Sequence, residues 1–144
     1  MFRNILIVCH ANVCRSPAAE LLFKSMASRA ALAFHSAGID ANDGDGIDPT
    51  MSRLLAERGV DAAPHRSRRL NRALMRAADL VLVTERRQIA DVESLDPVAR
   101  GKVHLLGKWE DTEIADPYGG PEVDYRQSYT LIERLVQGWL QKIC

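Results

Sequence analysis

Residues 5–20 read ILIVCHANVCRSPAAE, and these residue types predict a strand, a loop and a helix in succession. The aliphatic run at 4–8 is typical of a buried strand. Ser16 and Pro17 then favour a helix start, with Ser16 as the N-cap and Pro17 at the first helical position. Apolar residues follow at 19, 22, 23, 26, 27 and 30, the spacing of a helix with one buried side. Cys9–Arg15 is therefore expected to form a loop between the strand and the helix.

The rest of the chain continues this alternation of strands and helices. Further strands are expected at 32–36, 80–84 and 103–106. Further helices are expected at 49–59, directly after the arginine-rich segment 65–76, and at 85–95. A final helix is expected over two interleaved apolar rows, 131/135/139 and 132/136/140. Residues 39–48 are a polar, glycine-rich loop, and 107–124 are irregular. We expect an α/β fold: a single domain over 1–144, with a twisted parallel sheet of about four strands and helices on both faces.

Composition excludes several classes of protein. The chain has 144 residues, of which 47% are hydrophobic and 26% charged, which excludes disorder, collagen and coiled coil. Nineteen basic and nineteen acidic side chains give a net charge of zero, which offers no reason to propose nucleic acid or membrane as a partner. No run is long enough for a membrane span or fits a secretory leader. We expect a soluble, cytoplasmic, unprocessed monomer.

The three cysteines do not form a recognisable disulfide or metal pattern. They lie at positions 9, 14 and 144, and four residues separate the first two. This spacing is neither a redox CxxC pair nor half of a zinc site, so no metal or other cofactor is expected. A reduced protein in which one cysteine reacts is the better interpretation.

The loop Cys9–Arg15 has the composition of a phosphate-binding loop. A tight loop can turn its backbone N–H groups inward around a tetrahedral dianion, and the start of the following helix adds partial positive charge. Arg15 offers a planar fork that grips two phosphate oxygens. The same groups favour the thiolate of Cys9, and Ser16 is placed to hydrogen-bond its sulfur. Asn12 tolerates the left-handed backbone that such a loop often needs.

Attack on a phosphate monoester also needs a proton donor for the leaving oxygen. The segment 116–119, Asp-Pro-Tyr-Gly, is the candidate, with Asp116 as the acid and Tyr118 as an apolar wall. Asp-Pro pairs also occur at 48 and 96. The pattern alone does not choose among the three.

Four segments resemble the low-molecular-weight protein-tyrosine phosphatases in order along the chain. They are ILIVCHANVCRSPAAE, SAGI at 36–39, DPT at 48–50 and DPYG at 116–119. The segment GKWEDTEIADPY at 107–118 further resembles the bacterial subgroup linked to exopolysaccharide synthesis and export, whose partners are tyrosine autokinases.

The resemblance implies a residue for each role. Cys9 would be the nucleophile that becomes phosphocysteine, and Asp116 would protonate the tyrosyl oxygen and then activate water. Cys14 would trap an oxidised Cys9 as a reversible disulfide, while Ser16 would stabilise the departing thiolate. The phosphate-binding residues would be His10, Ala11, Asn12, Val13, Cys14, Arg15 and Ser16.

Two positions depart from the family. Ala11 stands where glycine is usual, so a positive φ there would be strained. Asn42 and Asp43 stand where the family often has a large apolar or aromatic residue, which leaves Tyr118 as the aromatic wall. We expect the chemistry to survive, with fewer apolar contacts to favour aryl substrates.

Two other functions use the same loop. An arsenate reductase needs resolving cysteines, but Cys144 is the only cysteine after Cys14. A non-catalytic phosphopeptide-binding module is the second alternative. A nucleotide hydrolase is excluded because no Gly-Lys-Ser/Thr follows the first strand.

Overall fold

The computed structural model describes residues 2–29 and 31–144. Within these residues the sheet has four parallel strands in the order β2-β1-β3-β4. The strands are β1 Asn4–Cys9, β2 Ala33–Gly38, β3 Leu80–Val83 and β4 Val103–Leu105. The helices are α1 Arg15–Met26, α2 Pro49–Glu57, α3 Arg72–Ala77, α4 Arg87–Leu95 and α5 Glu122–Ile143, with 3-10 turns η1 Pro97–Ala99 and η2 Lys108–Glu110. This architecture confirms the expected α/β class and parallel sheet.

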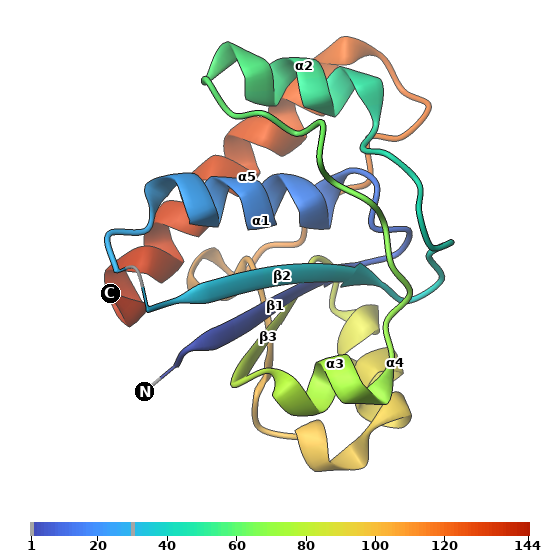
Figure 1. Ribbon diagram of the computed structural model, residues 1–144, viewed down its shortest axis with the longest axis vertical. Helices are drawn as coiled ribbons and strands as arrows, with labels where there is room; N and C mark the ends of the chain where they lie inside the picture. The colour runs from blue at the N-terminus through green and yellow to red at the C-terminus, as the bar shows by residue number, and fades with distance from the viewer. Residues whose placement is uncertain (1, 30) are drawn as a thin grey trace.

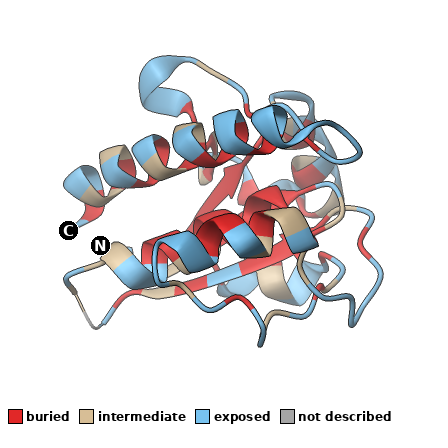
Figure 2. Cartoon of the chain, turned by 90° about the horizontal axis from the view of Figure 1, so that it is seen from above, coloured by how far each residue is buried: buried red, intermediate tan, exposed pale blue. Residues whose placement is uncertain are grey.

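Helices cover both faces of the sheet (Figure 1), with α1, α2 and α5 on one side and α3 and α4 on the other. The alternation of side chains along β1 explains why both faces of the sheet are covered by an apolar core. Ile5 and Ile7 belong to the core under α1 and α5, whereas Leu6 and Val8 belong to the core on the opposite face. Figure 2 shows that the helices turn buried residues inward and exposed residues outward.

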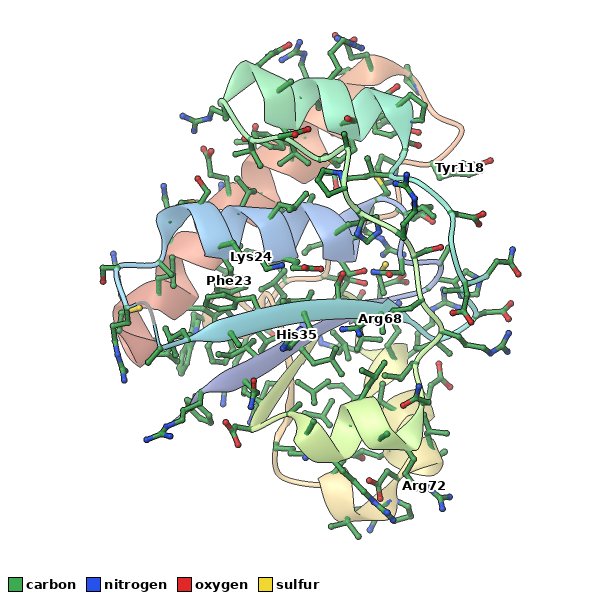
Figure 3. All side chains as sticks on the ribbon, viewed as in Figure 1. Phe23, Lys24, His35, Arg68, Arg72 and Tyr118 are labelled. Carbon is green, nitrogen blue, oxygen red and sulfur yellow. The ribbon has the colours of Figure 1, made fainter. Side chains whose placement is uncertain are left out.

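The first helix buries the side that its sequence pattern predicts. Ala19, Leu22 and Phe23 are buried, and Phe23 stacks on Phe34 of β2 with ring centroids 4.8 Å apart (Figure 3). The helix ends at Met26, and position 30 of the predicted apolar row lies outside the described residues.

Element ends differ from the prediction where side chains fix a turn. The strand expected at 80–84 ends at Val83, and the helix expected at 85–95 begins at Arg87. The side-chain oxygen of Gln88 accepts hydrogen bonds from the backbone N–H groups of Thr84 and Glu85, so these two residues form a bonded turn. No helix in the described part of the chain is both long and apolar enough to cross a bilayer.

The register places two loops at one edge of the sheet. Cys9 pairs with Gly38 of β2, and Val8 pairs with Val83 of β3. The loop after β1 and the turn after β3 therefore leave the carboxyl edge side by side. Ligands bind at this edge in open parallel sheets.

Candidate active site

The Cys9 sulfur lies inside the loop that follows the central strand. Its residue is 3% exposed, and the sulfur accepts a hydrogen bond from the Asn12 backbone N–H at 3.3 Å. The Ser16 hydroxyl lies 2.9 Å from the same sulfur. Because the Asn12 amide donates to the Ser16 oxygen at 2.8 Å, the hydroxyl proton of Ser16 remains available to the sulfur. The expected contact between Ser16 and Cys9 is therefore confirmed.

The prediction that Ser16 caps the first helix is wrong. The N-cap is Cys14, which makes no side-chain capping bond, and the helix begins at Arg15. Ser16 therefore lies at the second helical position, and Pro17 lies at the third, two positions later than expected. The Ser16 hydroxyl points toward the Cys9 sulfur and the Asn12 amide. It therefore forms hydrogen bonds within the loop and does not cap the helix.

Asn12 takes the left-handed backbone conformation, with φ of 58°. Its side chain is buried and donates to Ser16 and Ser36, and its amide oxygen accepts from the Arg68 backbone N–H. Among the described non-glycine residues only Asn12 and Asp111 have positive φ, so the strain expected at Ala11 is absent. The left-handed conformation lies at Asn12, the residue that the sequence analysis identified as able to adopt it.

Arg15 is the largest fully buried polar side chain near the loop, at 2% exposed. Its Nη1 donates to Glu85 Oε2 at 2.7 Å and to the Ile114 carbonyl at 2.8 Å, while Nη2 lies 3.7 Å from Asp116 Oδ2. Burial alone would raise the pKa of Glu85, but the hydrogen bond and charge of Arg15 hold it below its ordinary value. The guanidinium is thus held in a fixed orientation beneath the loop.

Sequence reasoning missed Glu85. The available signal was its position, two residues after the buried strand β3 and at the same sheet edge as Cys9. From sequence alone, however, a single glutamate at the start of an expected helix looks the same as an ordinary solvent-exposed glutamate. Only the parallel register brings it under Arg15.

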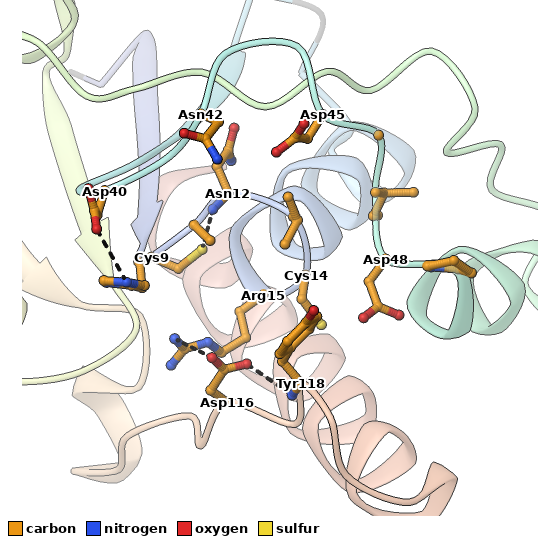
Figure 4. Close-up of a pocket in the computed structure, with 16 residues that line it drawn as sticks. Cys9, Asn12, Cys14, Arg15, Asp40, Asn42, Asp45, Asp48, Asp116 and Tyr118 are labelled. Carbon is orange, nitrogen blue, oxygen red and sulfur yellow. Dashed lines mark hydrogen bonds and ion pairs between the residues drawn. The ribbon is translucent and has the colours of Figure 1, made fainter.

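These residues surround a cavity of about 470 Å³ (Figure 4). Its lining comprises Cys9, His10, Ala11, Asn12, Val13, Cys14, Arg15, Asp40, Asn42, Asp45, Gly46, Ile47, Asp48, Pro49, Asp116 and Tyr118. All the predicted site residues therefore meet here except Ser16, which lies behind the sulfur. His10 leans outward, with its side chain half exposed and 3.9 Å from the Asp40 carboxylate.

The three Asp-Pro pairs have different surroundings. Asp96 caps the turn η1 and is outside the cavity. Asp48 caps α2 through hydrogen bonds from the N–H groups of Thr50 and Met51. Asp116 is half exposed at the mouth, close to Arg15, and its oxygen accepts the Tyr118 N–H at 3.1 Å. Of the three, only Asp116 presents a carboxylate that an incoming ligand could reach.

The walls of the cavity are polar on one side and aromatic on the other. Asn42 and Asp45 stand opposite Tyr118 in Figure 4, and Tyr118 is 72% exposed, extending outward in Figure 3. Trp109 does not line the cavity but packs edge-on against Trp139, with ring centroids 5.2 Å apart.

Cys14 is buried beside the loop as a free thiol. Burial, and then the negative charge of Asp48, raises the pKa of Cys14 far above its usual range, so this thiol is neutral. Cys144 is an exposed free thiol at the end of the chain. Among the residues that the structure describes, no group of three or more His, Cys, Asp or Glu side chains could hold a metal ion.

Comparison with known proteins places this geometry in a family. The family model for low molecular weight phosphotyrosine protein phosphatases matches residues 4–144. The low molecular weight protein-tyrosine-phosphatase Wzb of Escherichia coli K12 is 40% identical over 144 residues, with 99% of this chain and 97% of that protein covered.

Two solved structures agree with the sequence match. The Erwinia amylovora tyrosine phosphatase AmsI superimposes with a TM-score of 0.93 at 36% identity, covering 99% of this chain and 93% of that one. Vibrio vulnificus Wzb in complex with benzylphosphonate gives a TM-score of 0.94 at 33% identity, covering 99% of each chain. The chain belongs to the low molecular weight protein-tyrosine phosphatase family, and its similarity to Wzb and AmsI confirms the resemblance to the exopolysaccharide-associated subgroup.

Proposed function

We propose that the protein hydrolyses phosphotyrosine through a phosphocysteine intermediate on Cys9. The observation that carries this proposal is the placement of a buried, hydrogen-bonded sulfur, a fixed guanidinium and a reachable carboxylate in one cavity. The sulfur attacks phosphorus and the P–O bond to the tyrosyl oxygen breaks, while Asp116 donates its proton to that oxygen. Water then attacks phosphorus, Asp116 takes its proton, and the S–P bond breaks to release phosphate.

The remaining residues of the loop bind and stabilise charge. Both short contacts of Arg15 use Nη1, so Nε and Nη2 are the donors that would bind phosphate oxygens. The backbone N–H groups of residues 10–15 would complete the cradle. Ser16 would stabilise the departing thiolate through the hydrogen bond already present, and Tyr118 and Asn42 would flank the substrate ring.

Substitution of Cys9 and Asp116 tests this mechanism. Cys9→Ser should abolish release of nitrophenol from 4-nitrophenyl phosphate while retaining phosphate binding, because the cradle and Arg15 remain. Asp116→Asn should lower kcat/KM for phenyl phosphate, whose poor leaving group needs a proton, about 10²–10⁴-fold, the usual range for a general acid. Asp91→Asn, at an exposed carboxylate on α4, is the matched control and should leave the rate unchanged.

The intermediate can be observed directly. Acid-quenched enzyme, digested during turnover, should carry one phosphoryl group on the peptide that contains Cys9. Wild-type enzyme that turns over without this adduct would contradict the covalent route. Wild-type protein that binds phosphotyrosine peptides without cleaving any aryl phosphate would instead support the phosphopeptide-binding alternative.

The arsenate reductase alternative lacks a resolving cysteine near the site. Cys144 follows the last turn of α5, and Figure 1 places this end of the helix on the opposite side of the molecule from the Cys9 loop. Because Cys14 is the only other cysteine near Cys9, we do not favour arsenate reduction.

The relatives named Wzb and AmsI point to a phosphoprotein of polysaccharide synthesis as the substrate. We infer that this substrate is a tyrosine autokinase. We also infer that the enzyme is a monomer and that it acts in the cytoplasm. Purified Cys9→Ser protein, incubated with a lysate, should retain a tyrosine-phosphorylated autokinase, and vanadate should release it. Retention of phosphotyrosine proteins that include no such kinase would contradict this assignment.

A further inference from the structure

The Tyr125 hydroxyl forms a buried hydrogen bond that the catalytic scheme above does not use. Tyr125 lies in the first turn of α5, is 5% exposed, and donates to Asp48 Oδ2 at 2.7 Å. Burial, followed by this hydrogen bond, raises the pKa of Tyr125 to about 12, so the hydroxyl keeps the proton that it donates. The two residues are 77 positions apart, so the bond joins distant parts of the chain.

Asp48 connects this bond to the loop that holds Cys9. Its backbone N–H donates to the Val13 carbonyl at 2.7 Å, and its Oδ1 accepts the first N–H groups of α2. Oδ2 is left for the tyrosine hydroxyl. Asp48 therefore fixes the Cys9 loop, α2 and α5 to one another through three different groups, and Figure 1 shows α2 lying across the first part of α5.

The segment with Asp116 is tethered to the same turn of α5. Pro121, which directly follows the turn at 117–120, is the N-cap of α5. Gly120 donates to the Pro117 carbonyl at 2.9 Å, and a Cβ on Gly120 would lie 2.8 Å from the Asp124 carboxylate. This hydrogen-bonded turn therefore leads directly into the first residues of α5, so the position of the start of α5 limits where the segment can lie.

Asp116 itself has few contacts that would hold it. Its carboxylate accepts the Tyr118 N–H and lies 3.7 Å from Arg15, and the side chain is half exposed. The position of this carboxylate relative to a substrate oxygen therefore depends on how firmly the 116–119 turn is held. A misplacement on the order of 1 Å is enough to lower a catalytic rate about 10²-fold.

We propose that Tyr125 is a positioning residue: its hydroxyl bond to Asp48 holds the 116–119 turn over the Cys9 loop, so that Asp116 can protonate the leaving oxygen. This inference rests on the proposed function. Phenylalanine at position 125 would keep the ring and lose only the hydroxyl, so Tyr125→Phe separates the polar bond from the packing of the ring.

Two substrates separate alignment from general stability. Phenyl phosphate has a poor leaving group and needs the proton from Asp116, whereas 4-nitrophenyl phosphate has a good leaving group and needs it less. Tyr125→Phe should lower kcat/KM about 10-fold for phenyl phosphate and less than about 2-fold for 4-nitrophenyl phosphate. Inhibition by inorganic phosphate should be unchanged, because the loop itself is intact.

Tyr129→Phe is the matched control. Tyr129 lies one turn further along α5, is buried to a similar degree, and its hydroxyl contacts Glu133 outside the cavity. Its replacement should leave both kcat/KM values unchanged. Asp48→Ser is a second variant: serine still caps α2, but its short side chain cannot reach Tyr125. It should lower kcat/KM for phenyl phosphate more than kcat/KM for 4-nitrophenyl phosphate, which keeps the test available if Tyr125→Phe fails to fold.

An unchanged ratio of the two kcat/KM values in both Tyr125→Phe and Asp48→Ser would overturn the proposal. Equal losses on both substrates, with a lower melting temperature, would also overturn it and assign Tyr125 a structural role alone. These outcomes are distinct from failure of the proposed function, in which wild-type protein would cleave neither substrate.

Discussion

Asn12 is the residue on which the geometry of the Cys9 loop depends most. Its side chain joins the loop to β2 through Ser36 and to the arginine-rich segment through the Arg68 N–H. Its carbonyl oxygen lies 2.8 Å from the His65 ring nitrogen. Its φ of 58° also directs its own N–H at the Cys9 sulfur. Conformation and hydrogen bonding thus act together at one position.

Two substitutions separate these contributions. Asn12→Ala removes the side-chain bonds and strains the backbone, whereas Asn12→Gly removes the bonds but tolerates positive φ. We expect Asn12→Ala to lower the free energy of unfolding by about 1–2 kcal/mol more than Asn12→Gly, the cost of left-handed conformation in a non-glycine residue. Urea denaturation measures the difference, and equal stabilities would show that the loop relaxes to negative φ.

At the scale of elements, the end of β2 supports the Cys9 loop from below. Gly38 pairs with Cys9, and a Cβ at position 38 would lie 2.7 Å from the His10 carbonyl oxygen and 2.8 Å from the Ala11 carbonyl carbon. Both atoms are backbone, so they cannot swing aside as a flexible side chain could. The strand end and the loop are packed too closely for any residue but glycine.

Gly38→Ala should therefore deform the loop. We expect a loss of about 1–3 kcal/mol of stability from overpacking, together with a fall in kcat/KM on 4-nitrophenyl phosphate of about 10-fold or more. Gly138→Ala in α5 is the control, since nothing lies within 4 Å of its new Cβ. It should gain about 0.5–1 kcal/mol with unchanged activity. A fully active Gly38→Ala enzyme would refute the close-packing argument.

At the scale of the whole molecule, exposed ion pairs join α5 to its neighbours. Arg126 pairs with Glu57 of α2 and Arg134 pairs with Glu110 of η2. Hydrogen bonds from arginine side chains lower the pKa values of Glu57, Glu110 and Glu122. These contacts are individually weak and sensitive to salt, but they act on the same helix.

Acid should therefore destabilise the protein. Because the folded pKa values of these glutamates lie below the unfolded value of about 4.3, their stabilisation is present above that pH and is lost as the pH falls through the folded values. Denaturation at pH values from 7 to 3 should show the steepest loss below about pH 4. A triple variant with glutamine at the three positions should show a shallower decline. A wild-type protein as stable at acid pH as at neutral pH would contradict this account.

Local sequence patterns were enough to predict the order of the strands and helices and the loop between the first strand and the first helix. The aliphatic run, the Cys9–Arg15 spacing and the apolar row after Pro17 depend on local periodicity and turn chemistry, which act over a few residues. The same locality explains the error at Ser16, where contacts with the buried sulfur and Asn12 outweighed capping.

Contacts between residues far apart in the chain could not be predicted in this way. The approach of Glu85 to Arg15 spans 70 positions and that of Tyr125 to Asp48 spans 77. Such contacts follow from the order and register of the parallel strands and from the packing of α5 on α2, and no short-range pattern encodes them. The physical reason is that side chains at separate sheet ends and helix turns become neighbours only when the apolar faces between them are buried.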